Sequence, residues 1–159
     1  MAETAQYLTL GIDQELFGID IRNVREILDM RPISKLPHAP AFLLGMIDVR
    51  GAGYPIVDLR TKLGLPRAEP TEATRIIILD VPVKGRTRGV GFVADRVFEV
   101  TGLDADQTEA APDVGGRWQS NYIAGIGRKG EAFIVVFDLE RLMKADDLAA
   151  ADLAIDRVA

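Results

Sequence analysis

The chain has 159 residues, of which 48% are hydrophobic and 27% are charged, and its formal net charge is −5. This balance is typical of a globular protein with one domain or two small half-domains, and its acidity argues against binding to nucleic acids or anionic membranes. The chain has no cysteine, which excludes disulfides and thiolate metal sites. It has neither a signal-peptide pattern nor an apolar run near the ~20 residues of a membrane-spanning helix. We therefore expect a cytoplasmic protein without direct membrane insertion.

The N-terminal part of the chain predicts a hairpin followed by a short helix. Apolar segments at 7–12 and 16–19 are separated by polar residues, as in two strands joined by a tight turn. After Asp20, a residue suited to capping a helix, apolar residues recur at helical spacing and predict a short amphipathic helix. The residues with this spacing are Ile21, Val24, Ile27 and Leu28.

The rest of the chain predicts further short strands and turns. The polar stretch 66–74 has no hydrophobic period and is expected to connect two halves of the chain. Residues from 140 onward, including an apolar stripe in the tail, predict helix. The other expected elements are strands over 44–49, 55–57, 75–83, 90–93, 122–126 and 132–137, a short helix over 59–63 and a long loop over 105–116.

Two blocks of the sequence recur in the same order. Residues 17–27 (FGIDIRNVREI) match residues 90–100 (VGFVADRVFEV), with Gly18 matching Gly91 and Val24 matching Val97. Glycines 45 and 125 also correspond, and each is followed later by an Asp-Leu dipeptide, at 58–59 and 138–139. Neither half is long enough to bury a good core alone. The repeat therefore predicts two β-barrels of ~70 residues each, packed together with a groove between them.

Several motifs resemble those of CheW-like domains. They are FGIDI at 17–21 followed by VxEI at 24–27, PAFxxGMIDVRG at 40–51, PIVDLR at 55–60, GFVADxV at 91–97 and YIxGIG at 122–127. The similarity covers about residues 6–145. Asp48 departs from the asparagine expected before the hydrophobic-Arg-Gly triplet, because it keeps the carbonyl acceptor but replaces the donor with a charge.

The resemblance implies a single CheW-like domain over residues 1–159, with a mainly β fold. This fold consists of two intertwined SH3-like five-stranded β-barrels related by a pseudo-twofold, with short helices. The two barrels are expected at about 1–70 and 71–145, followed by a helical tail at 146–159, and an exchange of terminal strands between the halves stays open.

The resemblance also implies a function in signal transduction. It predicts a chemotaxis adaptor that couples methyl-accepting chemoreceptors to a CheA-type histidine kinase. The implied partners are the regulatory domain of that kinase and the cytoplasmic tip of a chemoreceptor. The adaptor is then expected at membrane-associated receptor arrays.

Glu26 and Arg50 stand where the resemblance implies polar contacts with the receptor. Arg50 follows an apolar strand and precedes Gly51, so its guanidinium is expected to project from a strand end. An ordinary salt bridge between Arg50 and Glu26 is the alternative, and the two roles are compatible.

The receptor groove is expected to have apolar walls, because a bound helix buries one apolar face. Val24, Ile27 and Val100, together with Val97, are the candidate wall residues. Candidate kinase contacts are Phe42, Leu43 and Met46, all of which also suit a hydrophobic core.

The sequence has no recognisable catalytic or metal-binding motif. His38 is the only histidine and lies in a proline-rich loop, and there is no cysteine nucleophile or Gly-x-Ser-x-Gly elbow. Asp58 and Asp138 each precede a short predicted helix, which favours a capping role over an acid–base pair. We therefore expect no enzymatic activity, no cofactor and no metal.

Two other functions stay open. A small enzyme or ligand-binding module would need a carboxylate site between the halves, with Asp20, Asp48, Asp58 and Asp95 converging in one pocket. The same adaptor serving a non-chemotactic array, such as one that controls surface attachment, would differ only in its partners.

Overall fold

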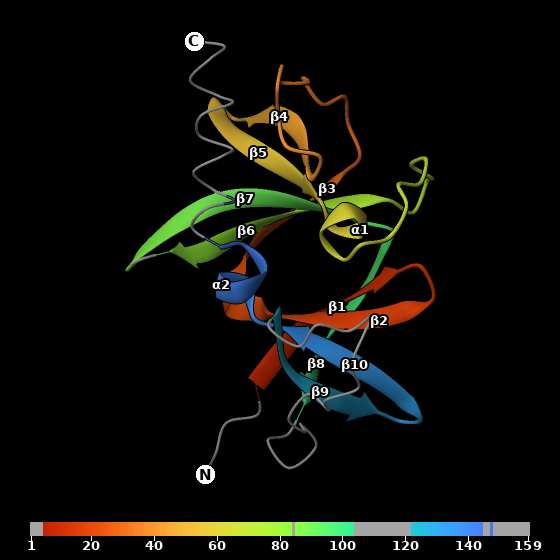
Figure 1. Ribbon diagram of the computed structural model, residues 1–159. Coiled ribbons are helices and arrows are strands. Elements are labelled where there is room, and N and C mark those ends of the chain that lie inside the picture. The colour runs from red at the N-terminus through yellow and green to blue at the C-terminus, as the bar shows by residue number, and fades with distance from the viewer. Residues whose placement is uncertain (1–4, 84, 104–121, 145–146, 148–159) are drawn as a thin grey trace.

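The computed structural model describes residues 5–83, 85–103, 122–144 and 147. These residues form two five-stranded sheets, accompanied by a 3-10 turn and two helices of one turn each (Figure 1). The predicted loop at 105–116 and the apolar stripe of the tail lie outside the described residues.

Sheet A has the strand order β8-β1-β2-β10-β9. Its strand β10 runs parallel to β2, and the other neighbours are antiparallel. The edge strands β8 and β9 contact each other, so the sheet curls into a barrel. Its strands are β1 (Ala5–Ile12), β2 (Glu15–Asp20), β8 (Arg96–Leu103), β9 (Ile123–Lys129) and β10 (Ala132–Phe137).

Sheet B has the strand order β3-β6-β7-β5-β4. Its strand β5 runs parallel to β7, and Ser34, just beyond β3, bridges Met46 of β4 and brings the two edges together. Its strands are β3 (Val24–Asp29), β4 (Leu43–Val49), β5 (Ala52–Asp58), β6 (Arg75–Val83) and β7 (Arg86–Ala94).

The two sheets are related by the internal repeat. Strands β1 and β2 of sheet A correspond to β6 and β7 of sheet B, and β8, β9 and β10 correspond to β3, β4 and β5. With these replacements the strand order of sheet A becomes that of sheet B. The predicted pair of intertwined five-stranded barrels is therefore confirmed. The exchange of strands is larger than expected, however, because β3 and β5 from the first half pair with β6 and β7, and β4 joins the same sheet through β5. The ranges 1–70 and 71–145 thus do not delimit the individual barrels.

The helix predicted from Ile21 is wrong. The chain makes only a 3-10 turn, η1 (Ile21–Asn23), in which Asp20 Oδ1 accepts from the backbone N–H of Arg22 at 2.9 Å, and then enters β3. Strand β3 has one more residue than β6 between its pairings at Val24 and Ile27. This bulge keeps both side chains on one face at a spacing of three residues, which imitates a helical pattern.

The two Asp-Leu helices, α1 (Leu59–Lys62) and α2 (Leu139–Leu142), are confirmed. Asp138 caps α2 by accepting from the backbone N–H of Arg141 at 3.1 Å. Asp58 makes no such bond, and its Oδ2 accepts instead from the hydroxyl of Thr61 at 2.8 Å. Both aspartates occupy the predicted N-cap positions, but only Asp138 caps its helix with the side chain.

The largest core cluster combines side chains from both sheets. Ile77 and Leu79 of β6 belong to it, whereas their neighbours Ile76 and Ile78 belong to a second cluster within sheet B. The strand is thus buried on both faces, and its alternate side chains serve two different cores. The first cluster, which we call the inter-barrel core, joins the two barrels.

Candidate functional site

The edge strands β3 and β8 carry two exposed apolar residues that are equivalent in the repeat. The exposed fraction is 42% for Ile27 and 46% for Val100. Ile27 pairs with Ile77, and Val100 pairs with Leu8; both partners belong to the inter-barrel core. Because directly paired residues point to the same face of a sheet, both side chains extend the inter-barrel core outward to the surface.

Val24 and Val97 lie deeper on the same two faces. Val24 pairs with Leu79, Val97 pairs with Leu10, and both valines are half-buried against the inter-barrel core. Strand β8 has an extra residue between Val97 and Val100, just as β3 has one between Val24 and Ile27. The repeat thus extends to the bulges, which place each valine and the next apolar residue on one face.

Glu26 and Arg50 form a two-pronged ion pair between β3 and the β4–β5 turn. Arg50 Nη1 donates to Glu26 Oε1 at 3.0 Å, and Arg50 Nη2 donates to Glu26 Oε2. The Arg50 side chain is 75% exposed, so it retains donors for another partner. Hydrogen bonding to Arg50, opposed by desolvation, lowers the pKa of Glu26 below its ordinary value. The expected salt bridge is present, although it joins two parts of a sheet and not a helix to a strand.

The repeat supplies a similar ion pair on the other barrel. Glu99 of β8 is equivalent to Glu26, and it pairs with Lys129 at the end of β9. Lys129 is a strand residue with a flexible ammonium group, whereas Arg50 lies in a tight turn with a positive φ of 52°. The two barrels therefore have related charges, but only the arginine is fixed by an unusual backbone conformation.

The candidate kinase contacts differ in accessibility. Phe42 is half-buried, with the Lys62 Nζ 4.9 Å from the centre of its ring. Met46 is also half-buried, but Leu43 is only 4% exposed and packs in a small cluster with Phe42 and Leu36. Leu43 is therefore a core residue, and Phe42 and Met46 are the two that offer surface.

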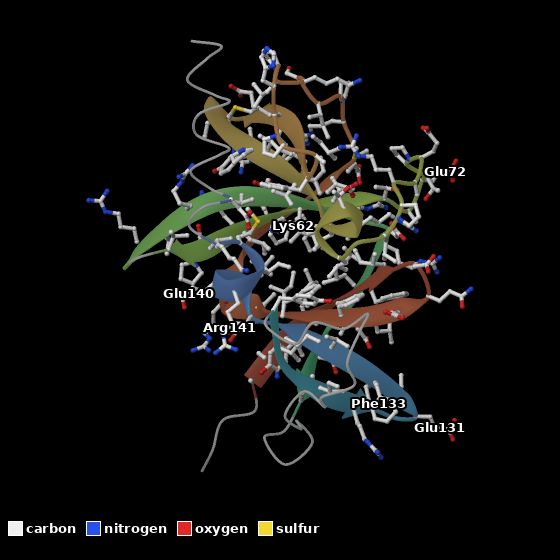
Figure 2. The ribbon with its side chains drawn as sticks, viewed as in Figure 1. Lys62, Glu72, Glu131, Phe133, Glu140 and Arg141 are labelled. Carbon is white, nitrogen blue, oxygen red and sulfur yellow. The ribbon has the colours of Figure 1, made fainter. Side chains whose placement is uncertain are left out.

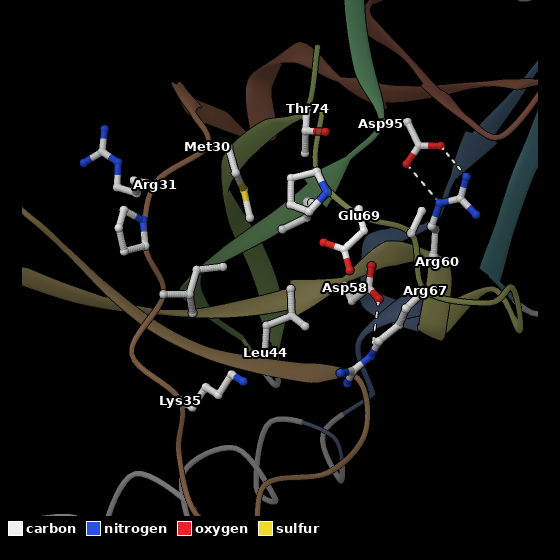
Figure 3. A pocket seen from close by; sticks show the side chains of 15 residues that line it. Met30, Arg31, Lys35, Leu44, Asp58, Arg60, Arg67, Glu69, Thr74 and Asp95 are labelled. Carbon is white, nitrogen blue, oxygen red and sulfur yellow. Dashed lines mark hydrogen bonds and ion pairs between the residues drawn. The ribbon is translucent and has the colours of Figure 1, made fainter. Parts of the chain in front are cut away.

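The four aspartates named for a carboxylate site do not converge. Asp58 and Asp95 line a cleft of about 570 Å³, in which each faces an arginine (Figure 3). Asp20 lines a different cleft of about 280 Å³, and Asp48 binds its own turn. His38 is exposed in the loop before β4. The described residues also contain no cluster of potential metal ligands.

Sequence reasoning missed two exposed aromatic residues. Phe98 of β8 is 51% exposed, and Phe133 of β10 is 55% exposed, with the guanidinium of Arg128 4.9 Å from the centre of its ring. Figure 2 shows Phe133 beside Glu131 on the β9–β10 hairpin. The segment 132–137 is apolar throughout, so its sequence gave no signal that Phe133 would face outward while Ile134 is buried.

Comparisons with known proteins agree with this architecture. The sequence matches the CheW-like domain family over residues 6–147. The chain belongs to this family. The chemotaxis protein CheW of Klebsiella aerogenes is 31% identical over 147 residues, which cover 92% of this chain and 86% of that protein. The chemotaxis protein CheW of Rhizobium meliloti is 30% identical over 159 residues, which cover 95% of this chain and 100% of that protein.

A solved structure of the same family has the same fold. The crystal structure of the scaffolding protein TtCheW from Thermoanaerobacter tengcongensis superposes with a TM-score of 0.79 at 26% identity, covering 92% of each chain. The family is thus one of chemotaxis adaptors and scaffolds. Among the described residues of this member, no helix is both long and apolar enough to cross a membrane.

Proposed function

We propose that this protein is a non-catalytic scaffold that couples chemoreceptors to a CheA-type histidine kinase at membrane-associated receptor arrays. The observation that carries the proposal is membership of the CheW-like family over nearly the whole chain, with relatives named as chemotaxis and scaffolding proteins. Its partners would be the regulatory domain of the kinase and the helical cytoplasmic tip of the receptor.

The receptor would bind across the two edge strands of the inter-barrel core. Val24 packs against that core, and Ile27 and Val100 are exposed on the corresponding faces of β3 and β8, so a receptor helix would bury one apolar face on these three residues. Glu26 and Arg50 would lie at the rim, where the free donors of the arginine would contact polar groups of the helix.

The kinase would bind elsewhere, through the ends and edges of the barrels. Its regulatory domain is expected to resemble this fold, so two related barrels would meet end to end, and repeated contacts of this kind would build a ring or array. Phe42 and Met46 are the candidate contacts, with Leu43 supporting Phe42 from beneath. Transient interfaces of this type need only about 1,000 Å² of buried surface.

The experiment is a calorimetric titration of the purified protein with each partner from the same organism. One ligand is a helical hairpin fragment of a chemoreceptor tip, and the other is the kinase regulatory domain. We expect both to bind, and saturation with one to leave a site for the other. A pull-down from native cells that recovers neither a receptor nor a kinase, together with flat titrations, contradicts the proposal.

Two alternatives have their own tests. A non-chemotactic array would show the same binding but with receptors of a different pathway. A ligand-binding module or enzyme would use the 570 Å³ cleft, where Asp58 is only 7% exposed. Turnover of ATP, a phosphoester or a peptide that disappears in Asp58→Asn would establish that alternative in place of the scaffold.

A further inference from the structure

The turn that carries Arg50 has an unusual backbone. Strands β4 and β5 are joined by two residues, Arg50 and Gly51, whose φ angles are 52° and 85°. Turns with two positive φ angles suit the twist of a β-hairpin, and glycine adopts them readily. Arginine does not, because its Cβ disfavours the left-handed conformation. Something in the structure must therefore stabilise Arg50 in this state.

Asp48 is the residue that makes this contact. Its Oδ1 accepts a hydrogen bond from the backbone N–H of Gly51 at 2.9 Å, which closes the turn from the strand side. The bond fixes the peptide that follows Arg50 and so restricts the direction of the arginine side chain. From this position the guanidinium reaches both carboxylate oxygens of Glu26 on β3.

We infer that Asp48 is a positioning residue, which holds Arg50 in the left-handed turn so that its guanidinium is preorganised against Glu26 for partner binding. The functional part of this inference rests on the proposed receptor site. The carboxylate uses only its acceptor oxygen here, so an asparagine at this position would serve equally well. In the similar ion pair on the other barrel, between Glu99 and Lys129, the cation lies in strand β9, and the turn position equivalent to Arg50 is Gly130, whose positive φ of 63° needs no such support.

The first measurement needs no partner: the pKa of Glu26 determined by NMR in variants of Asp48. Asp48→Ala removes the acceptor, so we expect the ion pair with Arg50 to loosen and the pKa of Glu26 to rise toward its ordinary value. Deleting a nearby negative charge would by itself lower the pKa of Glu26, so the sign separates the two effects. Asp48→Asn keeps the acceptor, and we expect it to show no rise.

The second measurement is the affinity of the same variants for a chemoreceptor hairpin fragment. Loss of one positioning hydrogen bond in Asp48→Ala is expected to weaken binding roughly three- to tenfold, and Asp48→Asn is expected to restore it. The matched control is Glu131→Ala, which deletes the same charge from the exposed β9–β10 hairpin and should leave both readings unchanged.

The outcomes are decisive in both directions. A rise in the pKa of Glu26 and weaker binding in Asp48→Ala, both restored in Asp48→Asn, support the inference. A wild-type pKa of Glu26 in Asp48→Ala, or an asparagine variant that behaves like the alanine variant, overturns it. If Arg50→Ala binds the receptor fragment like the wild type, the proposed receptor site fails, whereas the pKa measurement still decides the role of Asp48.

Discussion

The backbone N–H of Asp13 donates to Oδ2 of Asp95 at 2.7 Å. Asp95 lies where the chain passes from β7 of sheet B to β8 of sheet A, and Asp13 lies in the β1–β2 turn of sheet A. Arg60 of α1 binds both carboxylate oxygens of Asp95, at 2.8 and 3.0 Å. One carboxylate therefore joins the β1–β2 turn, the β7–β8 crossover and α1.

This network predicts a pH-dependent stability. Desolvation raises the pKa of Asp95, but hydrogen bonds from Arg60 and Asp13 outweigh it, so the pKa is lower than usual. A carboxyl with a lowered pKa in the folded state adds stability above its unfolded pKa of about 4, and that stability is lost as the pH falls through the folded pKa. We expect Asp95→Asn to lose about 1–3 kcal/mol at neutral pH and to approach the wild type under acidic conditions.

Urea unfolding of Asp95→Asn and of the wild type, at neutral and at acidic pH, tests this prediction. The control is Asp29→Asn, because the Asp29 side chain is 90% exposed and its ion pair with Arg75 should contribute little. A constant difference between Asp95→Asn and the wild type down to acid pH would contradict the assigned role of the ionised carboxylate.

Ile27 and Val100 are predicted to matter for receptor binding and not for folding. Both are nearly half-exposed, so Ile27→Ser or Val100→Ser should leave the melting temperature almost unchanged. Each should weaken receptor binding roughly tenfold, through the lost burial of one apolar side chain. The control is Phe133→Ser, a similarly exposed apolar residue on β10 that is not part of the proposed receptor surface. Equal losses in all three variants would indicate a nonspecific effect.

Val24→Met and Arg50→Ala probe the wall and the rim of the same surface. The larger side chain at position 24 overpacks the surface where a helix must approach, at about 1–3 kcal/mol, which corresponds to a ~5- to 150-fold loss of affinity. Arg50→Ala removes a planar donor and should weaken receptor binding while kinase affinity stays the same. Calorimetry with both partners and a melting curve of each variant test this prediction. Unchanged receptor binding in both variants, or unfolding of either variant, would assign these residues to the core.

Gly45 is predicted to be intolerant of any side chain. A Cβ atom there would lie 2.1 Å from the backbone oxygen of Ser34, and the φ angle is +147°. Gly64, with a φ of +79°, has open space around it and serves as the control. Gly64→Ala should lose about 1–2 kcal/mol from the left-handed backbone alone. Gly45→Ala should lose clearly more free energy of unfolding, as measured with urea. Equal losses in the two variants would mean that the bridge between Ser34 and Met46 adapts to the added methyl group.

The exchange of strands predicts that neither half folds alone. Residues 1–70 contain β3, β4 and β5 but lack β6 and β7, which lie between β3 and β5 in the sheet. We expect fragments 1–70 and 71–159 to show little sheet by circular dichroism when separate, and to regain it when mixed. A cooperative unfolding transition in either isolated fragment would contradict this.

Local signals in the sequence were sufficient for most strands and for the family. The strands at 75–83 and 132–137 match the observed β6 and β10 in full, because β-branched and apolar residues recur there between turn residues. The repeat predicted two related barrels, and the paired Asp-Leu dipeptides predicted both short helices. Glu26 and Arg50 were singled out from motifs together with the salt bridge between them, but that ion pair forms only because the two edges of sheet B, β3 and β4, come together in the barrel.

Only the tertiary structure decided which strands pair and which faces are buried. The segment after Ile21 forms a strand because β6, distant in the sequence, supplies its hydrogen-bond partners. The bulge beside Val24 interrupts the two-residue alternation by which a strand is recognised in a sequence. The role of Asp95 depends on Asp13 and Arg60, which no local pattern links to it. The chain encodes local preferences within a few residues, whereas burial on two faces and the crossing of strands arise only when both halves pack together, because neither half can bury its apolar surface alone.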